Sequence, residues 1–177
     1  MAASDSADAL VAALLELDRH VGRDGWDQPP RLFALVLTDV LAEAEPALSR
    51  RLGLRPTGAG GLPGALTAIE QDEFRSTGDL THDLSGLEWP ESVYGCALAT
   101  VRMFLPAAYE SELPTEPEAA AAVVAAHPQR QEIRVVVGAD RAGNRHGVGR
   151  LASRPEELLG APDLVPGLTS ALAHTLC

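Results

Sequence analysis

The amino-acid sequence predicts an α+β domain in which an antiparallel sheet of about five strands is backed by helices. Two observations predict this fold class. The apolar residues change between helical spacing and short extended runs, in the element order α-β-β-β-α-β-β-α. The strands in this order are joined by connections of hairpin scale, which favours antiparallel pairing over the parallel sheet of nucleotide-binding α/β proteins. A length of 177 residues corresponds to a single domain, which we expect to span residues 1–177.

The first elements follow from periodicity and from proline. A helix is expected over residues 5–21, where leucines and valines recur at helical spacing, and Gly22 is typical of a helix end. Two adjacent prolines, Pro29 and Pro30, end any helix and lead into an extended segment. The apolar run at residues 32–37 then predicts the first strand.

A broken helix and a weak strand come next. Asp39 is expected to cap the helix, and Pro46 divides it into two short pieces that end near Gly53. Residues 58–64 predict a glycine-rich loop, and residues 65–74 predict a weak strand.

The middle of the chain contains the most apolar segment. Residues 76–89 are polar and predict about one helical turn. Residues 93–105 are apolar on both faces, as in a central strand that is covered on both sides or paired with long neighbours. A further helix is expected to begin at Thr115, with a capping box between Thr115 and Glu118, and to stop at His127 before a proline.

The C-terminal third predicts a hairpin and a helix. Residues 132–140 and 145–153 flank a turn that contains Gly143, which indicates two antiparallel strands. The last helix is expected to start near Asp163, where leucines recur every four residues.

The charge excludes several kinds of chemistry. The chain has 25 acidic and 14 basic residues, for a formal net charge of -11, and every basic residue is arginine. Without lysine there is no Schiff base, no lysine-bound pyridoxal cofactor and no P-loop lysine, and we expect no cofactor. Phosphate groups repel an acidic chain, so we expect neither nucleic acid nor an anionic membrane as a partner.

Cysteine usage and the N-terminus favour a cytoplasmic protein. Cys96 and Cys177 are expected to be free thiols in a reducing compartment, with a disulfide as the alternative. Asp5 and Asp8 occupy positions where a signal peptide needs positive charge. The apolar run at residues 119–126 is much shorter than the roughly 18 residues that a membrane span needs, so no membrane insertion is expected.

Five segments together are similar to one family. They are LDRHV (17–21), WDQPPRLFALV (26–36), GCAL (95–98), HPQRQEIRVVVG (127–138) and PDLVPGL (162–168). The chain resembles the actinobacterial PPA1309 family over most of its length, which implies a bacterial cytoplasmic domain and no particular activity. Residues 147–150 (GVGR) are less apolar than the second hairpin strand of these relatives. The element order also resembles the secretion-chaperone-like fold, and such a likeness carries no function by itself.

No catalytic or metal-binding pattern is present in the sequence. No two of the five histidines lie within four residues of each other, and no cysteine pair accompanies them. Cys96 lies in an apolar run typical of a small core residue. The loop at residues 58–61 neither follows a strand nor opens a helix, as a phosphate loop must. We therefore expect no catalytic residue and no metal site.

Two candidate binding regions remain. The first is the proline-rich loop with Trp26, Asp27, Gln28 and Arg31: the tryptophan either packs over a helix end or anchors a partner. The second is charge: residues 70–118 carry eleven acids and two arginines, for -9, whereas residues 129–154 carry six arginines and two acids, for +4. These arginines are Arg130, Arg134, Arg141, Arg145, Arg150 and Arg154.

Two functions are compatible with this charge pattern. Either the hairpin arginines pair with the acidic segment, inside the molecule or across a homodimer, or they bind an acidic peptide or an anionic ligand, with Arg130, Arg134 and Arg150 as the contacts. We expect a non-enzymatic protein-interaction module of the adaptor or chaperone type, which binds an unknown protein or a second copy of itself. The alternative is a small-molecule enzyme or sensor that binds an anion at the arginine-rich hairpin.

Overall fold

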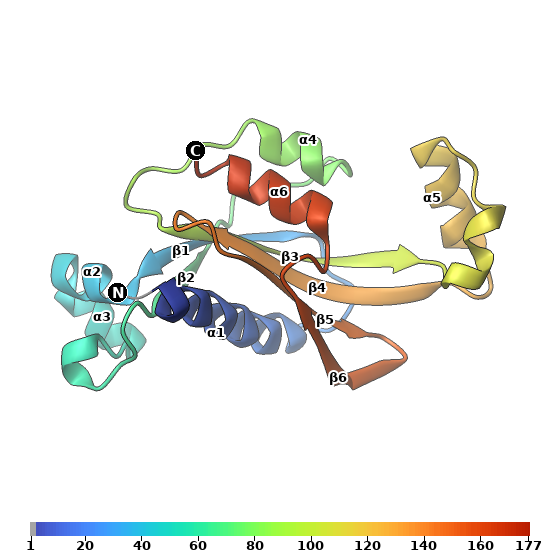
Figure 1. The fold of residues 1–177 in the computed structure, drawn as a ribbon. Coiled ribbons are helices and arrows are strands. Elements are labelled where there is room, and N and C mark those ends of the chain that lie inside the picture. Colours follow the sequence, from blue (N-terminus) through green and yellow to red (C-terminus); the bar gives the residue numbers. More distant parts are fainter. Residues whose placement is uncertain (1–2) are drawn as a thin grey trace.

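The computed structural model describes residues 3–177 and contains one antiparallel sheet with helices on both faces (Figure 1). The strand order is β2-β1-β3-β4-β5-β6. The strands are β1 (Arg31–Leu37), β2 (Leu66–Glu70), β3 (Gly95–Phe104), β4 (Gln131–Asp140), β5 (Arg145–Leu151) and β6 (Arg154–Ala161). The helices are α1 (Ala3–Gly22), α2 (Thr38–Ala44), α3 (Pro46–Leu52), α4 (Leu80–Ser85), α5 (Pro117–Ala126) and α6 (Pro166–His174), with two 3-10 turns, η1 (Thr57–Ala59) and η2 (Ala107–Glu112).

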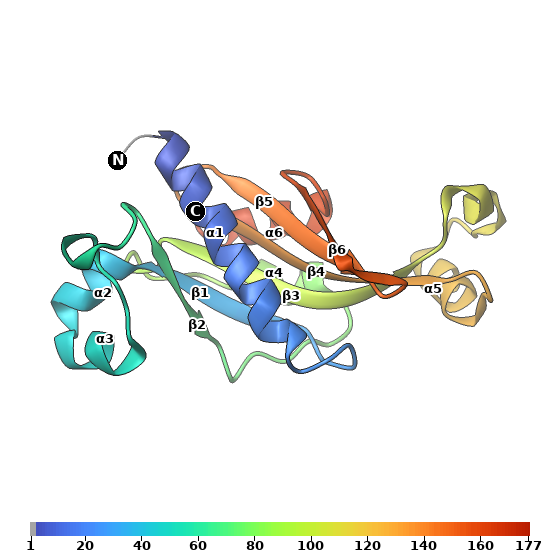
Figure 2. The same cartoon turned by 90° about the horizontal axis from the view of Figure 1, so that it is seen from below.

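Helix α1 lies across one face of the sheet (Figure 2). Its apolar stripe packs against side chains that alternate along the strands, as the helical and extended periodicities require. The buried residues of this layer include Leu10, Leu14, Leu17, Val21, Phe33, Leu35, Ala97, Val136 and Val148. Each fully buried leucine or phenylalanine contributes about 2 kcal/mol of transfer free energy, so this helix is a main source of stability.

The opposite face is covered by α4 and α6 (Figure 1). The buried residues of this second layer include Leu32, Leu84, Leu98, Val135, Val137, Leu168 and Leu172. Val135 and Val137 face this layer, whereas Val136 faces α1, because successive side chains of a strand point to opposite faces. The prediction of a central strand covered on both sides is confirmed for residues 95–100 of β3, which are all buried, whereas residues 101–104 are half-buried or exposed.

The sheet has one strand more than the five expected from the sequence. The additional strand is β6, which pairs with β5 alone and is exposed along almost its whole length. Because β6 buries almost nothing, its sequence has no alternating apolar pattern to predict it. No helix among residues 3–177 is long and apolar enough to cross a membrane.

Three predicted helix starts are wrong in detail. No side chain caps α2, because both carboxylate oxygens of Asp39 accept hydrogen bonds from the backbone and hydroxyl of Thr57 instead. Helix α5 begins at Pro117 with Glu116 as its N-cap residue and without a side-chain cap, so the capping box of Thr115 does not form. Helix α6 begins at Pro166 rather than near Asp163, since a proline fits the first turn of a helix.

Strands β3 and β4 continue beyond β1, flanked by β5 as far as Ile133, and their last two residue pairs form a two-stranded ribbon. Strand β1 pairs with β3 only over residues 95–99, whereas the β3–β4 pairing continues to Phe104 and Gln131. The ribbon carries η2 and α5 away from the other helices (Figures 1 and 2). We call the segment from residue 105 to residue 130 the arm.

Candidate functional site

Most of the residues singled out in the sequence lie around the C-terminal end of α1. Arg134 and Arg150 project from β4 and β5 toward Asp18, which is only 2% exposed. The Nε atom of Arg150 donates to Asp18 Oδ2 at 2.8 Å, and Nη2 of Arg134 lies 4.0 Å from Asp18 Oδ1. Arg134 and Arg150 therefore pair with an acid of the first helix, and not with the described acids of residues 70–118.

Trp26 covers the buried guanidinium of this cluster. The guanidinium carbon of Arg134 lies 4.6 Å from the centroid of the Trp26 ring, a cation–π distance. A Cβ atom at position 22 would lie 3.1 Å from Nη2 of Arg134, so Gly22 leaves room for the guanidinium. Trp26 is half-buried, and the guanidinium that it covers lies beside Gly22, the last residue of α1.

Gln28 and Arg31 fasten the loop that follows α1. The amide of Gln28 donates to the carbonyls of Val21 and Gly25, which satisfies acceptors at the end of the helix. Arg31 makes a two-pronged ion pair with Glu70, with both N···O distances at 2.8 Å. This guanidinium lowers the pKa of the Glu70 carboxyl, chiefly through the hydrogen bonds. These contacts tie the first helix to the β1–β2 edge.

Asp27 and the other hairpin arginines lie outside this cluster. Asp27 is exposed, and Arg130 is exposed at the base of the arm, where its Nη1 donates to the carbonyl of His127. Arg141 donates to four backbone carbonyls, including those of Val93 and Leu176. Five of the seven candidates, Trp26, Gln28, Arg31, Arg134 and Arg150, are thus engaged within the chain in positioning α1.

Asp18 is the member of this cluster that sequence reasoning missed. It lies four residues after Leu14 on the apolar stripe of α1, where an acid requires a buried partner. The position of Asp18 on this apolar stripe therefore indicates a buried acid with a charged partner.

Nucleophilic chemistry has no support at Cys96. The thiol is completely buried, and burial raises its pKa to about 11, so it carries no thiolate at neutral pH. Within the described part of the chain, no three His, Cys, Asp or Glu side chains are grouped so that they could hold a metal ion.

The arm presents an apolar helix. Residues 119–126 of α5 are all alanine or valine, yet Val124 is the only buried residue among them, and Ala121, Ala122, Ala125 and Ala126 are exposed. The contacts of α5 with the rest of the fold run mainly to β3. This helix therefore displays apolar surface that the described chain leaves uncovered.

The arm has its own fixed geometry. Nε2 of His127 lies 3.0 Å from a carboxylate oxygen of Glu112, and Nδ1 of His127 accepts from the backbone of Gln129. The ring of Tyr109 lies 5.0 Å from the His127 ring. These contacts join the two ends of the arm, so α5 is held as an ordered projection.

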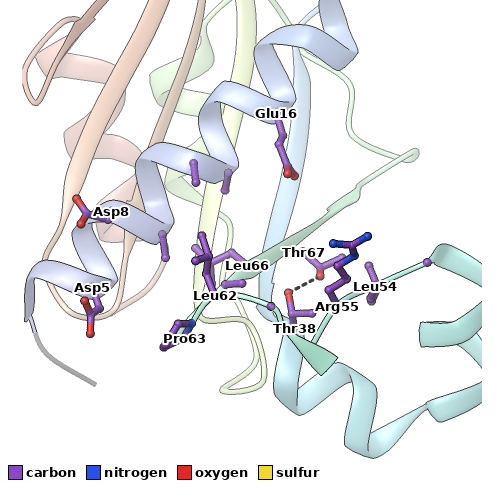
Figure 3. Close-up of a pocket in the computed structure, with 17 residues that line it drawn as sticks. Asp5, Asp8, Glu16, Thr38, Leu54, Arg55, Leu62, Pro63, Leu66 and Thr67 are labelled. Atoms are coloured by element: carbon purple, nitrogen blue, oxygen red, sulfur yellow. Dashed lines mark hydrogen bonds between the residues drawn. The ribbon is translucent and has the colours of Figure 1, made fainter. Parts of the chain in front are cut away.

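A pocket of about 660 Å³ lies between α1 and the loop that precedes β2 (Figure 3). Its floor is apolar and includes Ala9, Ala13 and Leu66. Glu16 borders it from α1, and Arg55 borders it from the loop. A volume of this size falls within the range of about 300–1,000 Å³ that is typical of small-molecule sites.

Comparisons with known proteins identify a family. The family model described as PPA1309-like protein matches residues 10–177, nearly the whole chain. Neither the curated proteins nor the solved structures give a match. The match spans α1 from its first buried leucine, all six strands and the arm. The chain therefore belongs to the PPA1309-like protein family.

Proposed function

We propose that the protein is a non-enzymatic protein-interaction module, an adaptor or chaperone-like domain, and that α5 is the surface through which it binds. The observation that carries this proposal is an ordered apolar helix on an arm that projects from the domain (Figure 1). Contiguous exposed apolar surface with a polar border is a mark of protein-interaction sites.

The composition of α5 favours a groove as its receptor. Alanine side chains let another backbone approach closely, and burying them adds about 25 cal/mol for each Å² of apolar surface removed from water. Glu116 and Glu118 are exposed at the start of the helix, so a matching groove carries positive charge beside that end. A helix lying in an apolar groove is a common mode of recognition.

The order of the helices and strands also supports the chaperone-like part of the proposal. The element order supports a comparison with the secretion-chaperone-like fold, and the family match supports an actinobacterial origin. We propose a cytoplasmic location. The molecule that carries the groove for α5 is either a second copy of the chain, which gives a homodimer, or another protein.

Affinity capture from the native host tests this function. Wild-type protein is compared with Ala122→Glu, which places a charge on the exposed side of α5, and with Ala47→Glu, the same change on the exposed side of α3. We expect the wild type to capture one specific partner, or to self-associate in light scattering, and this binding to resist high salt. The amount bound is expected to fall at least about tenfold in Ala122→Glu and to be unchanged in Ala47→Glu. Binding that is equal in the two variants, or a monomer that captures nothing, contradicts the proposal.

The alternative of an anionic ligand at the hairpin receives less support. An anion there competes with Asp18, whose buried carboxylate already faces Arg134 and Arg150. A thermal-shift screen with phosphates, nucleotides and carboxylates tests the alternative, which predicts stabilisation that disappears in Arg150→Ala.

A further inference from the structure

We infer that the pocket between α1 and the 53–65 loop is a binding site for a small zwitterion with an apolar body, of amino-acid or dipeptide size. The inference does not depend on the proposed function, because the loop that lines the pocket lies at the opposite end of the sheet from the arm (Figure 1). It rests on three features: opposite charges on facing walls, an apolar floor, and polar groups with hydrogen-bonding capacity to spare.

The charges come from opposite walls. Figure 3 shows Glu16 on α1 and Arg55 on the loop directed toward the space between them. Among the described residues, neither side chain has a hydrogen bond or an ion pair within 4.0 Å, so both remain available to a ligand. Asp5 and Asp8 line the same wall as Glu16 and add negative charge on the α1 side. A ligand ammonium therefore fits the α1 wall, and a ligand carboxylate fits Arg55, which suits carboxylates through its fork of N–H donors.

The floor of the pocket suits an aliphatic side chain. It is made by small residues of α1 together with Leu62, Pro63 and Leu66. Leu62 is 70% exposed in the free pocket. An aliphatic ligand group that covers this leucine removes apolar surface from water, which favours binding.

A pair of threonines provides a further polar contact. The hydroxyls of Thr38 and Thr67 lie 2.8 Å apart and bond to each other (Figure 3). One hydroxyl donates to the other, and the proton of the accepting hydroxyl has no acceptor among the described residues, so it can bond a ligand oxygen at the pocket wall. Thr38 is only 4% exposed, so its position is fixed by the surrounding fold.

The loop that carries Arg55 is held in place before any ligand arrives. Asp39 accepts from both the backbone and the hydroxyl of Thr57, each at 2.6 Å. The backbone N–H of Gly61 donates to the carbonyl of Pro56 at 3.0 Å, and a side chain at position 61 would overlap the carbonyl oxygen of Arg55. The glycine-rich loop thus folds back on Arg55 and fixes the wall, which reduces the ordering cost of binding.

Calorimetric titration with defined probes tests the inference. The probes are L-leucine and leucyl-leucine, together with their C-terminal amides, which lack the carboxylate, and their N-acetyl forms, which lack the ammonium. We expect at least one of the two zwitterions to bind, and each of its blocked forms to bind at least about tenfold more weakly.

Two variants assign the charges to their walls. Glu16→Gln and Arg55→Gln are each expected to weaken the zwitterion at least about tenfold. The amide form is expected to bind wild type and Arg55→Gln equally, because it has no carboxylate for Arg55 to recognise. The controls Glu43→Gln and Arg51→Gln alter exposed charges on α2 and α3 that do not line the pocket, and we expect them to bind as wild type does.

Three results overturn the inference. The first is no binding of either zwitterion to a folded wild type. The second is equal binding of the zwitterion and its blocked forms. The third is equal binding by wild type and both pocket variants. Ala122→Glu on the arm leaves this binding unchanged, so failure here and failure of the proposed function are separate outcomes.

Discussion

Removing the charge of Asp18 is expected to destabilise the fold more than any other single change of a charged side chain considered above. The carboxylate is 2% exposed and faces Arg150 at 2.8 Å and Arg134 at 4.0 Å. Asp18→Asn preserves the shape of the side chain but leaves the guanidinium of Arg134, which is 7% exposed, without a counter-ion. A buried charge that loses its partner costs about 3–5 kcal/mol.

The lower end of that range applies here. Arg150 is partly exposed and regains water, and Arg134 keeps its contact with the Trp26 ring. We therefore expect Asp18→Asn to lower the free energy of unfolding by about 3 kcal/mol. With a denaturant slope of about 2 kcal/mol per molar urea, the midpoint falls by about 1.5 M.

Equilibrium urea unfolding followed by circular dichroism measures this change. The matched control is Arg154→Gln, which breaks an exposed pair with Glu157 at 3.7 Å and is expected to cost less than about 0.5 kcal/mol. Combining Asp18→Asn with Arg134→Met removes the stranded charge and is expected to restore part of the loss. If Asp18→Asn and Arg154→Gln unfold at the same midpoint, the buried pair does not anchor α1 as described.

Two further predictions concern titration and thiol reactivity. Because Arg31 lowers the pKa of Glu70 in the folded state, the pair stabilises the protein above the ordinary carboxyl pKa, and this contribution is lost as pH falls through the folded pKa. Wild type therefore loses more stability than Arg31→Met between about pH 6 and about pH 3, and equal losses in acid unfolding contradict the assignment. Alkylation of the native protein at about pH 8 is expected to label the exposed Cys177 and to spare Cys96, whose pKa is raised to about 11 by burial. Unfolded protein labels at both thiols, and mass spectrometry that finds native Cys96 modified as fast as Cys177 refutes the prediction.

The elements that the sequence predicts well are those that bury side chains. Strands β1, β3 and β4 leave apolar patterns in the sequence because one or both of their faces are covered. Strand β6 is held by backbone pairing with β5 and is almost entirely exposed, so no periodicity marks it. Apolar periodicity in the sequence indicates which strands are buried, but it does not indicate a strand that pairs at an exposed edge.

Polar contacts were harder to predict because they depend on distant residues. Asp39 was assigned to the helix beside it, yet it bonds Thr57, which the fold brings close from eighteen residues away. One of the two alternatives for the hairpin arginines pairs them with the acids of residues 70–118, yet the diagonal path of α1 brings Asp18 to Arg150 across 132 residues. A charged side chain pairs with whatever the tertiary fold places next to it.

The arm shows a different limit of sequence reasoning. The alanine run predicted a helix because alanine has the highest helix propensity, and its end at His127 is confirmed. Its exposure was not predictable, because a uniformly apolar helix has no polar face to indicate which side meets water.

Photo-crosslinking from α5 tests the central claim most directly. A photoreactive amino acid placed at position 122 lies on the exposed side of the arm, and the same amino acid at position 47 lies on the exposed side of α3. Our account predicts an adduct between the chain and a second polypeptide, either a partner protein or another copy, from position 122 and not from position 47. No adduct from position 122, or equal adducts from both positions, would contradict a binding role for the arm.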